Sequence, residues 1–215
     1  MLGTPNLGSV ISVSRLYRGF RLGLREIPPH ILSYFATPFE TLPLPGTVAL
    51  LDANALALGS STITGDLVVT ASGAITDAGA LSVGGNTAIT AGAGNNVTLN
   101  NANHFGGSVG IVSANDVTIS DDDALNLAAS TINGNLAITA SGAVTDSGAL
   151  SIAGTTSIAA GAGNNINLDA ANDFGSAVSI ASGNNVRLND VNALSMGTST
   201  ISGNLQITAA GAVAG

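Results

Sequence analysis

The stretch "STITGDLVVTASGAITDAGAL" at residues 61–81 decides the fold of this chain, because it recurs at a fixed distance. It returns as "STINGNLAITASGAVTDSGAL" at residues 130–150 and as "STISGNLQITAAGAVAG" at residues 199–215. Each copy starts 69 positions after the one before, and 38 of the 69 positions are identical between residues 61–129 and 130–198. Such self-similarity is typical of a solenoid, in which each unit buries its apolar face only against its neighbours.

Apolar residues within one copy alternate with polar or small ones, and a period of two indicates β-strands. The alternating pairs are Leu67 and Val69, Leu81 and Val83, Val97 and Leu99, Val109 and Ile111, Val117 and Ile119, and Leu125 and Leu127, with weaker signals at Ile75, Ile89 and Phe105. Nine short strands in each copy divide into three coils of about 23 residues, each with three sides. The sequence therefore predicts an all-β fold, a parallel β-helix (β-solenoid) of about seven coils and roughly 35 Å in length.

Substitutions between the copies indicate which side chains point inward. Val69 becomes Ile138, which keeps an aliphatic side chain of similar size, as a packed interior requires. The adjacent Val68 becomes Ala137, a change that an outward position tolerates. Phe105 and Phe174, 69 positions apart, are expected to fill the core at a wide corner.

Glycine and asparagine clusters separate the strands. "GAGNN" at 92–96 and 161–165 and "SGNN" at 182–185 supply residues that tolerate left-handed backbone conformations. Stacked asparagine side chains can also form hydrogen-bonded ladders between coils.

Residues 1–45 differ in composition from the repeat array at residues 46–215. They hold all six prolines, five of the seven aromatic residues and four of the five arginines. We expect a partly disordered segment or a cap over the first coil. A basic amphipathic helix around Val13 to Leu24 that lies on a membrane, and a mis-called start of a longer reading frame, remain alternatives. The array is expected to stop within its last copy, as a fragment would.

Charge and cysteine content exclude several functions. Residues 1–45 carry four Arg and two Glu, for a net charge of +2, whereas the array carries one Arg and eleven Asp, for −10. A surface of that sign repels phosphate, so nucleic acid is not an expected partner. The chain has no cysteine, so disulfides and thiolate metal sites are not available. No secretion signal is recognisable in residues 1–45.

The array resembles a family of exported bacterial proteins. The phrases that carry the resemblance are "GNLAITASGAVTDSGALSIAG" at 134–154, "DANALALG" at 52–59 and "ANDFGSAVSIASGNNVRL" at 171–188. They resemble the tandem repeats of filamentous-hemagglutinin-type exoproteins and related autotransporter adhesins of Gram-negative bacteria. The resemblance implies a right-handed parallel β-helix at the outer cell surface or secreted from it. It further implies a non-catalytic spacer or display surface whose partners are a host or cell-surface receptor and neighbouring repeats of a longer chain.

A carbohydrate lyase or hydrolase is the rival class, because parallel β-helices also carry such enzymes. Sugar chemistry needs a proton donor, a base and charge stabilisation, whereas the array offers only Arg187 and His104 as basic residues. His104 aligns with Asp173 in the next copy and is interpreted as an exposed turn residue. We therefore predict no enzymatic activity, no catalytic residue and no cofactor. Asp146 and Asp173 are the carboxylates whose substitution would test this.

Asp121, Asp122 and Asp123 form the single acidic run, and a solvated turn is the expected interpretation, with no metal site. A calcium-binding solenoid is the alternative.

A second alternative is an ice-binding face of threonines. The recurring candidates, dispersed among the sides, are Thr62, Thr70, Thr76 and Thr87 with Thr131, Thr139, Thr145 and Thr156. The strand around Leu205 and Ile207 is expected to lie in an uncovered coil, so end-to-end self-association is a further prediction.

Overall fold

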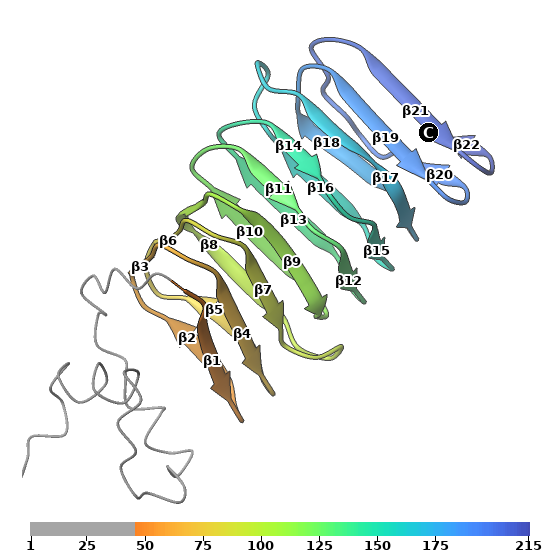
Figure 1. Cartoon of the computed structure of the whole chain (residues 1–215). Coiled ribbons are helices and arrows are strands. Elements are labelled where there is room, and N and C mark those ends of the chain that lie inside the picture. Colours follow the sequence, from red (N-terminus) through yellow and green to blue (C-terminus); the bar gives the residue numbers. More distant parts are fainter. Residues whose placement is uncertain (1–45) are drawn as a thin grey trace, which may run out of the picture.

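The structure is a computed structural model that describes residues 46–215. Its parallel strands stack in about eight turns along one axis, which confirms the predicted all-β solenoid (Figure 1). The interpretations of residues 1–45 concern a segment outside the described residues. Over residues 46–215 we find no helix with the length and apolar character needed to cross a membrane.

Twenty-two strands form three hydrogen-bonded sheets in the described part of the chain. The 11-stranded sheet contains β1 (Val48–Asp52), β4 (Leu67–Ala71), β7 (Thr87–Thr90), β9 (Ser108–Ser113), β11 (Leu125–Leu127), β12 (Ser130–Ile132), β14 (Val144–Asp146), β15 (Leu150–Ile152), β17 (Ile166–Phe174), β19 (Val186–Asp190) and β21 (Leu205–Ala209). The 9-stranded sheet contains β2 (Leu56–Leu58), β3 (Ser61–Ile63), β5 (Ile75–Asp77), β6 (Leu81–Val83), β8 (Val97–Phe105), β10 (Val117–Asp121), β13 (Leu136–Ala140), β16 (Thr156–Ala159) and β18 (Val178–Ser182). The third sheet pairs β20 (Leu194–Ser195) with β22 (Val213–Ala214).

One turn of the solenoid is shorter than the coil of about 23 residues that the strand count predicted. Successive turns are about 20 residues apart. The strand register accordingly pairs Val48 with Leu67, Leu67 with Thr87, and Thr87 with Val109. The prediction was wrong because it counted nine strands in each copy and omitted β3 and its equivalent β12. The two signals at Val97 and Phe105 lie in one long strand, β8. With β8 still counted as two segments and β3 added, a copy has ten segments at three segments per turn, or about three and one-third turns.

The extra third of a turn moves equivalent residues to different sides of the stack. Leu67 in β4 and Leu136 in β13 occupy the same position in two copies, yet β4 belongs to the 11-stranded sheet and β13 to the 9-stranded sheet. The equivalent strands β5 and β14 also lie in different sheets, β5 in the 9-stranded sheet and β14 in the 11-stranded sheet. A feature that recurs in each copy is therefore presented in a different direction by the next copy.

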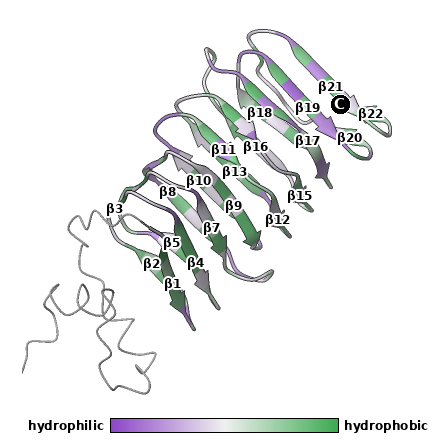
Figure 2. Ribbon diagram, viewed as in Figure 1, coloured by the Kyte–Doolittle hydropathy of each residue, from purple (hydrophilic) through white to green (hydrophobic). Residues whose placement is uncertain are grey.

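Aliphatic side chains fill the interior of the stack, as the alternating pattern predicted. Figure 2 shows that hydrophobic residues recur along the strands from one end of the stack to the other. The inward positions of the first copy are at most 2% exposed: Leu67, Val69, Ile75, Leu81, Val83, Ile89, Val97, Leu99, Val109, Ile111, Val117, Ile119, Leu125 and Leu127. Phe105 and Phe174 are buried among them, which confirms their role as core residues. Burial of one such side chain contributes about 1.5–3 kcal/mol before conformational entropy is counted.

The predicted turn chemistry at the "GAGNN" segments is confirmed. Gly92 and Gly161 both adopt a φ of 85°, a left-handed conformation that glycine enters without steric cost. The N–H of Asn95 closes the first of these turns on the carbonyl of Gly92 at 3.1 Å, and its side chain donates to the carbonyl of Ala91 at 2.7 Å.

Side-chain ladders connect successive turns at the corners, as the sequence predicted for asparagine. Asn165 Oδ1 accepts from the backbone and the side chain of Asn185, at 3.2 and 3.1 Å. Asn185 Oδ1 in turn accepts both groups of Asn204, at 3.1 and 3.2 Å. Aspartate takes the same place elsewhere, since Asp66 accepts the N–H of Asn86 at 2.7 Å. Each ladder residue thus satisfies a backbone donor of the next turn.

Candidate functional site

A buried asparagine occurs at the same place in both complete copies, where the strands β8 and β17 bend around a corner. Asn103 and Asn172 are both fully buried. Asn172 Oδ1 accepts the N–H of Leu150 at 2.8 Å, and its Nδ2 donates to Asp146 Oδ2 at 2.7 Å. Asn103 makes the equivalent bonds in the first copy. Because each amide binds two groups of the turn below its own, it fixes the relative register of the two turns.

The carboxylate below each buried asparagine holds the bend of the strand above it. Asp77 accepts the N–H groups of Asn100 and Asn101, both at 3.0 Å, and the side chain of Asn103 at 2.8 Å. Asp146 accepts the equivalent N–H groups of residues 169 and 170 in the second copy. These carboxylates stabilise backbone that leaves the regular ladder, which is a structural use of charge.

Asp121 lies one turn above Asn103 and is only 4% exposed. The solvated turn predicted for the acidic run is therefore wrong at its first residue, because the observed register places Asp121 inside the corner. Burial raises the pKa of the Asp121 carboxyl from its usual 3.8 to about 6, and the charge of Asp123 adds to the increase. The N–H groups of Asp123 and Phe105 donate to Asp121 and oppose this shift.

This elevated pKa predicts a pH-dependent stability. Between pH 3.8 and about 6 the folded chain holds a proton on Asp121 that the unfolded chain has released, so its contribution to the free energy of unfolding falls as the pH rises through this window. Asp121→Asn removes the group. We expect the variant to gain on the order of 2–3 kcal/mol relative to the wild type between pH 4 and pH 7.5. Urea midpoints of both proteins at the two pH values, in metal-free buffer, measure the change, and a constant difference would contradict the assignment.

His104 lies in β8 beside the acidic run. It is part of a strand and 45% of its side chain is exposed, so the expected turn position is wrong. Its Nδ1 lies 3.2 Å from Asp122 Oδ1 and 3.3 Å from Asp123 Oδ2. One ligand atom from each of His104, Asp121, Asp122 and Asp123 lies within 4.8 Å of the other three. Within residues 46–215, this is the one group of three or more histidine and acidic side chains close enough to hold a metal ion.

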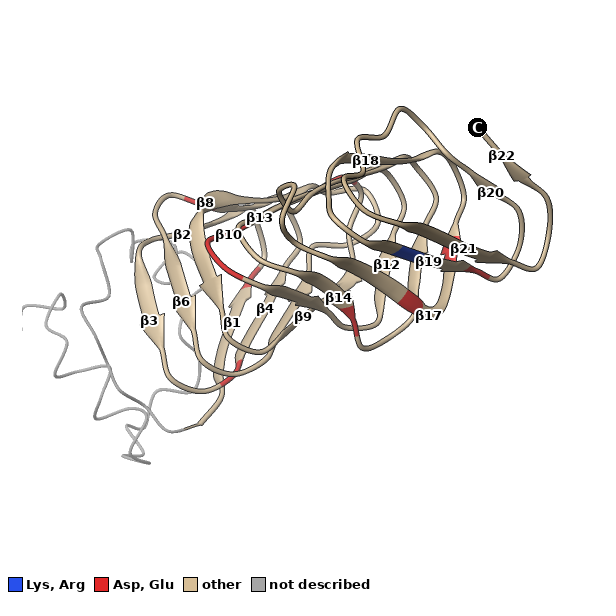
Figure 3. Cartoon of the chain, turned by 90° about the horizontal axis from the view of Figure 1, so that it is seen from above, with Lys and Arg blue, Asp and Glu red and all other residues tan. Residues whose placement is uncertain are grey.

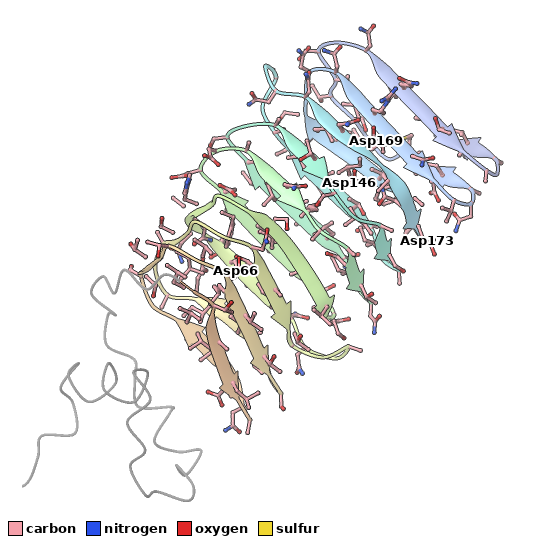
Figure 4. All side chains as sticks on the ribbon, viewed as in Figure 1. Asp66, Asp146, Asp169 and Asp173 are labelled. Atoms are coloured by element: carbon pink, nitrogen blue, oxygen red, sulfur yellow. The ribbon has the colours of Figure 1, made fainter. Side chains whose placement is uncertain are left out.

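The carboxylates singled out for a rival enzyme make structural contacts. Figure 4 shows Asp146 on β14 with Asp169 and Asp173 on the longer strand β17. Asp173 accepts a hydrogen bond from the side chain of Asn192 at 2.8 Å. Asp169 Oδ2 lies 3.3 Å from Nη1 of Arg187 on β19. Figure 3 shows that the acidic residues are scattered along the stack.

The threonines do not gather on one face, in agreement with the expectation from the sequence. Thr87 and Thr156 are 2% and 1% exposed, and their hydroxyl groups point into the interior. Thr62 on β3 and Thr70 on β4 belong to strands of different sheets.

The fold and these contacts define a repeat protein of the β-solenoid class. A family model described as repeats of unknown function (DUF5649) matches residues 45–112, 114–181 and 183–215. These matches cover more than half of the chain, and their starting points recur with the same period as the sequence copies. The chain belongs to this family. No curated protein and no solved structure matches it.

Proposed function

We propose that the chain is a non-catalytic structural segment of an exported bacterial surface protein, where it serves as a spacer or display surface in adhesion. The observation that carries the proposal is the use of its polar residues. The recurring pairs of Asp77 with Asn103 and Asp146 with Asn172 connect one turn to the next, as the corner ladders do. Polar groups used in this way let the stack lengthen by repetition without a new core.

The resemblance to filamentous-hemagglutinin-type repeats supports an extracellular location and a receptor on a host or cell surface as the partner. The composition favours the same role. The array has a net charge of −10. Equivalent outward positions of successive copies lie on different sides of the stack. A long array of this kind would present its surface in several directions, which suits contact with other cells. Antibodies against residues 46–215 should label intact cells of the source organism or detect the protein in their medium. Labelling only after lysis would contradict the proposed location.

The absence of turnover is the prediction that separates this proposal from a carbohydrate-active enzyme. Asp146 and Asp173 hold backbone and side-chain groups of the stack, so we expect no cleavage of polyuronides or other glycans between pH 4 and 9. Reducing-end and unsaturated-product assays on a glycan panel measure this. Product formation that Asp146→Asn or Asp173→Asn abolishes, in a variant with unchanged circular dichroism, would establish the enzyme instead.

A further inference from the structure

The group of His104, Asp121, Asp122 and Asp123 combines residues from two turns of the solenoid. The imidazole comes from β8, whereas the carboxylates come from the end of β10 and the two residues after it. The position of β10 above β8 is fixed by the pairing of Asp121 with Asn103 and by the hydrogen bond from the N–H of Asp122 to the carbonyl of Asn103, at 2.7 Å. The four ligand atoms are therefore held together by the register of the sheet.

Within residues 46–215, no arginine or lysine compensates the negative charge of this group. Arg187 is the one arginine of residues 46–215, which contain no lysine, and it pairs with Asp169. Three carboxylates thus surround one imidazole, and one of them, Asp121, is only 4% exposed. A buried carboxylate is costly unless a cation or hydrogen bonds compensate it. The N–H groups of Phe105 and Asp123 donate to Asp121 at 3.4 and 3.2 Å, and a bound divalent cation would add the positive charge that these hydrogen bonds do not supply.

The donor set selects among cations. Zinc takes imidazole nitrogen at about 2.0–2.1 Å and carboxylate oxygen at about 2.0–2.2 Å, so the ligand atoms of a tetrahedral site lie roughly 3.3–3.6 Å apart. His104 Nδ1 already lies 3.2 and 3.3 Å from oxygens of Asp122 and Asp123, and the four ligand atoms all lie within 4.8 Å of one another. Calcium and magnesium prefer oxygen ligands alone, whereas imidazole suits transition metals. We propose that His104, Asp121, Asp122 and Asp123 form a binding site for one divalent transition-metal ion such as zinc.

The second copy supplies a matched variant. Asp173 takes the place of His104 there, and Val191 and Asn192 take the places of Asp122 and Asp123. His104→Asp therefore introduces a residue that the same strand position already accommodates. It removes the nitrogen ligand and keeps the carboxylates, so zinc binding should weaken and the calcium preference should rise.

Calorimetric titration of the full chain with zinc chloride and with calcium chloride at pH 7 tests the proposal. We expect one zinc ion per chain, bound more tightly than calcium, and at least a tenfold weaker zinc affinity in His104→Asp and in Asp122→Asn. His30→Gln removes the other histidine of the chain and should leave the zinc affinity unchanged. Circular dichroism verifies that each variant is folded. No zinc binding up to millimolar concentration, tighter calcium binding by the wild type, or equal zinc affinities of the wild type and His104→Asp would each overturn the site.

Discussion

Leu136→Asp is expected to lower the free energy of unfolding by roughly 3–5 kcal/mol, because it places an unpaired carboxylate in the apolar interior. Leu136 is 2% exposed and lies between Val117 of the turn below and Thr156 of the turn above. An aspartate at this position has no partner for its charge. It must either stay ionised in an apolar layer or bind a proton at neutral pH, and both outcomes destabilise the fold.

The matched control for this prediction is Thr139→Asp on the same strand. Thr139 is exposed, so its replacement should change the free energy of unfolding by less than about 1 kcal/mol. Urea midpoints of the two variants measure the contrast. Equal midpoints would show that the assignment of inward and outward positions is wrong.

Asn172→Leu is the second large change, with an expected loss of about 2–4 kcal/mol in the free energy of unfolding. Leucine has a similar size but cannot replace the hydrogen bonds of Asn172, so the buried N–H of Leu150 loses its acceptor and Asp146 loses a donor. A loss of this size would show that the buried polar pairs stabilise the stack and do not merely tolerate burial.

Asn167→Leu provides the comparison on the same strand, β17. The side chain of Asn167 is partly exposed and makes no side-chain hydrogen bond to the described residues. We expect its replacement to change the urea midpoint little. If Asn172→Leu were as stable as Asn167→Leu, the proposed structural use of the polar pairs would be refuted.

The sequence predicted the interior of the solenoid well, because the period of two and the exchange of Val69 for Ile138 both report on packing. It did not predict the turn length. The short strands β3 and β12 were not counted, although each offers one large aliphatic, Ile63 or Ile132, as β5 does with Ile75. Omitting this one segment in each copy lengthened the predicted coil beyond the observed spacing of about 20 residues.

That error also concealed the metal-binding group. A coil of about 23 residues would place His104 beside Leu127. The observed register instead brings His104 next to Asp122 and Asp123.

The buried asparagines were missed for a different reason. Asn103 and Asn172 lie in polar segments that resemble turns, and the available signal was their exact retention in both copies, two positions before Phe105 and Phe174.

Cross-linking of engineered cysteines tests the central claim, that the chain is a parallel stack in which each turn of about 20 residues contacts its neighbours. The chain has no cysteine of its own. Thr118 and Ala137 are register partners on β10 and β13, both partly exposed, and adjacent strands lie about 4.8 Å apart. The pair Thr118→Cys and Ala137→Cys should therefore join rapidly with a short thiol-specific cross-linker, as peptide mass spectrometry would detect. The pair Thr118→Cys and Ser141→Cys, which a coil of about 23 residues would bring together, should not join. Efficient joining of the second pair in place of the first would contradict the stack described above.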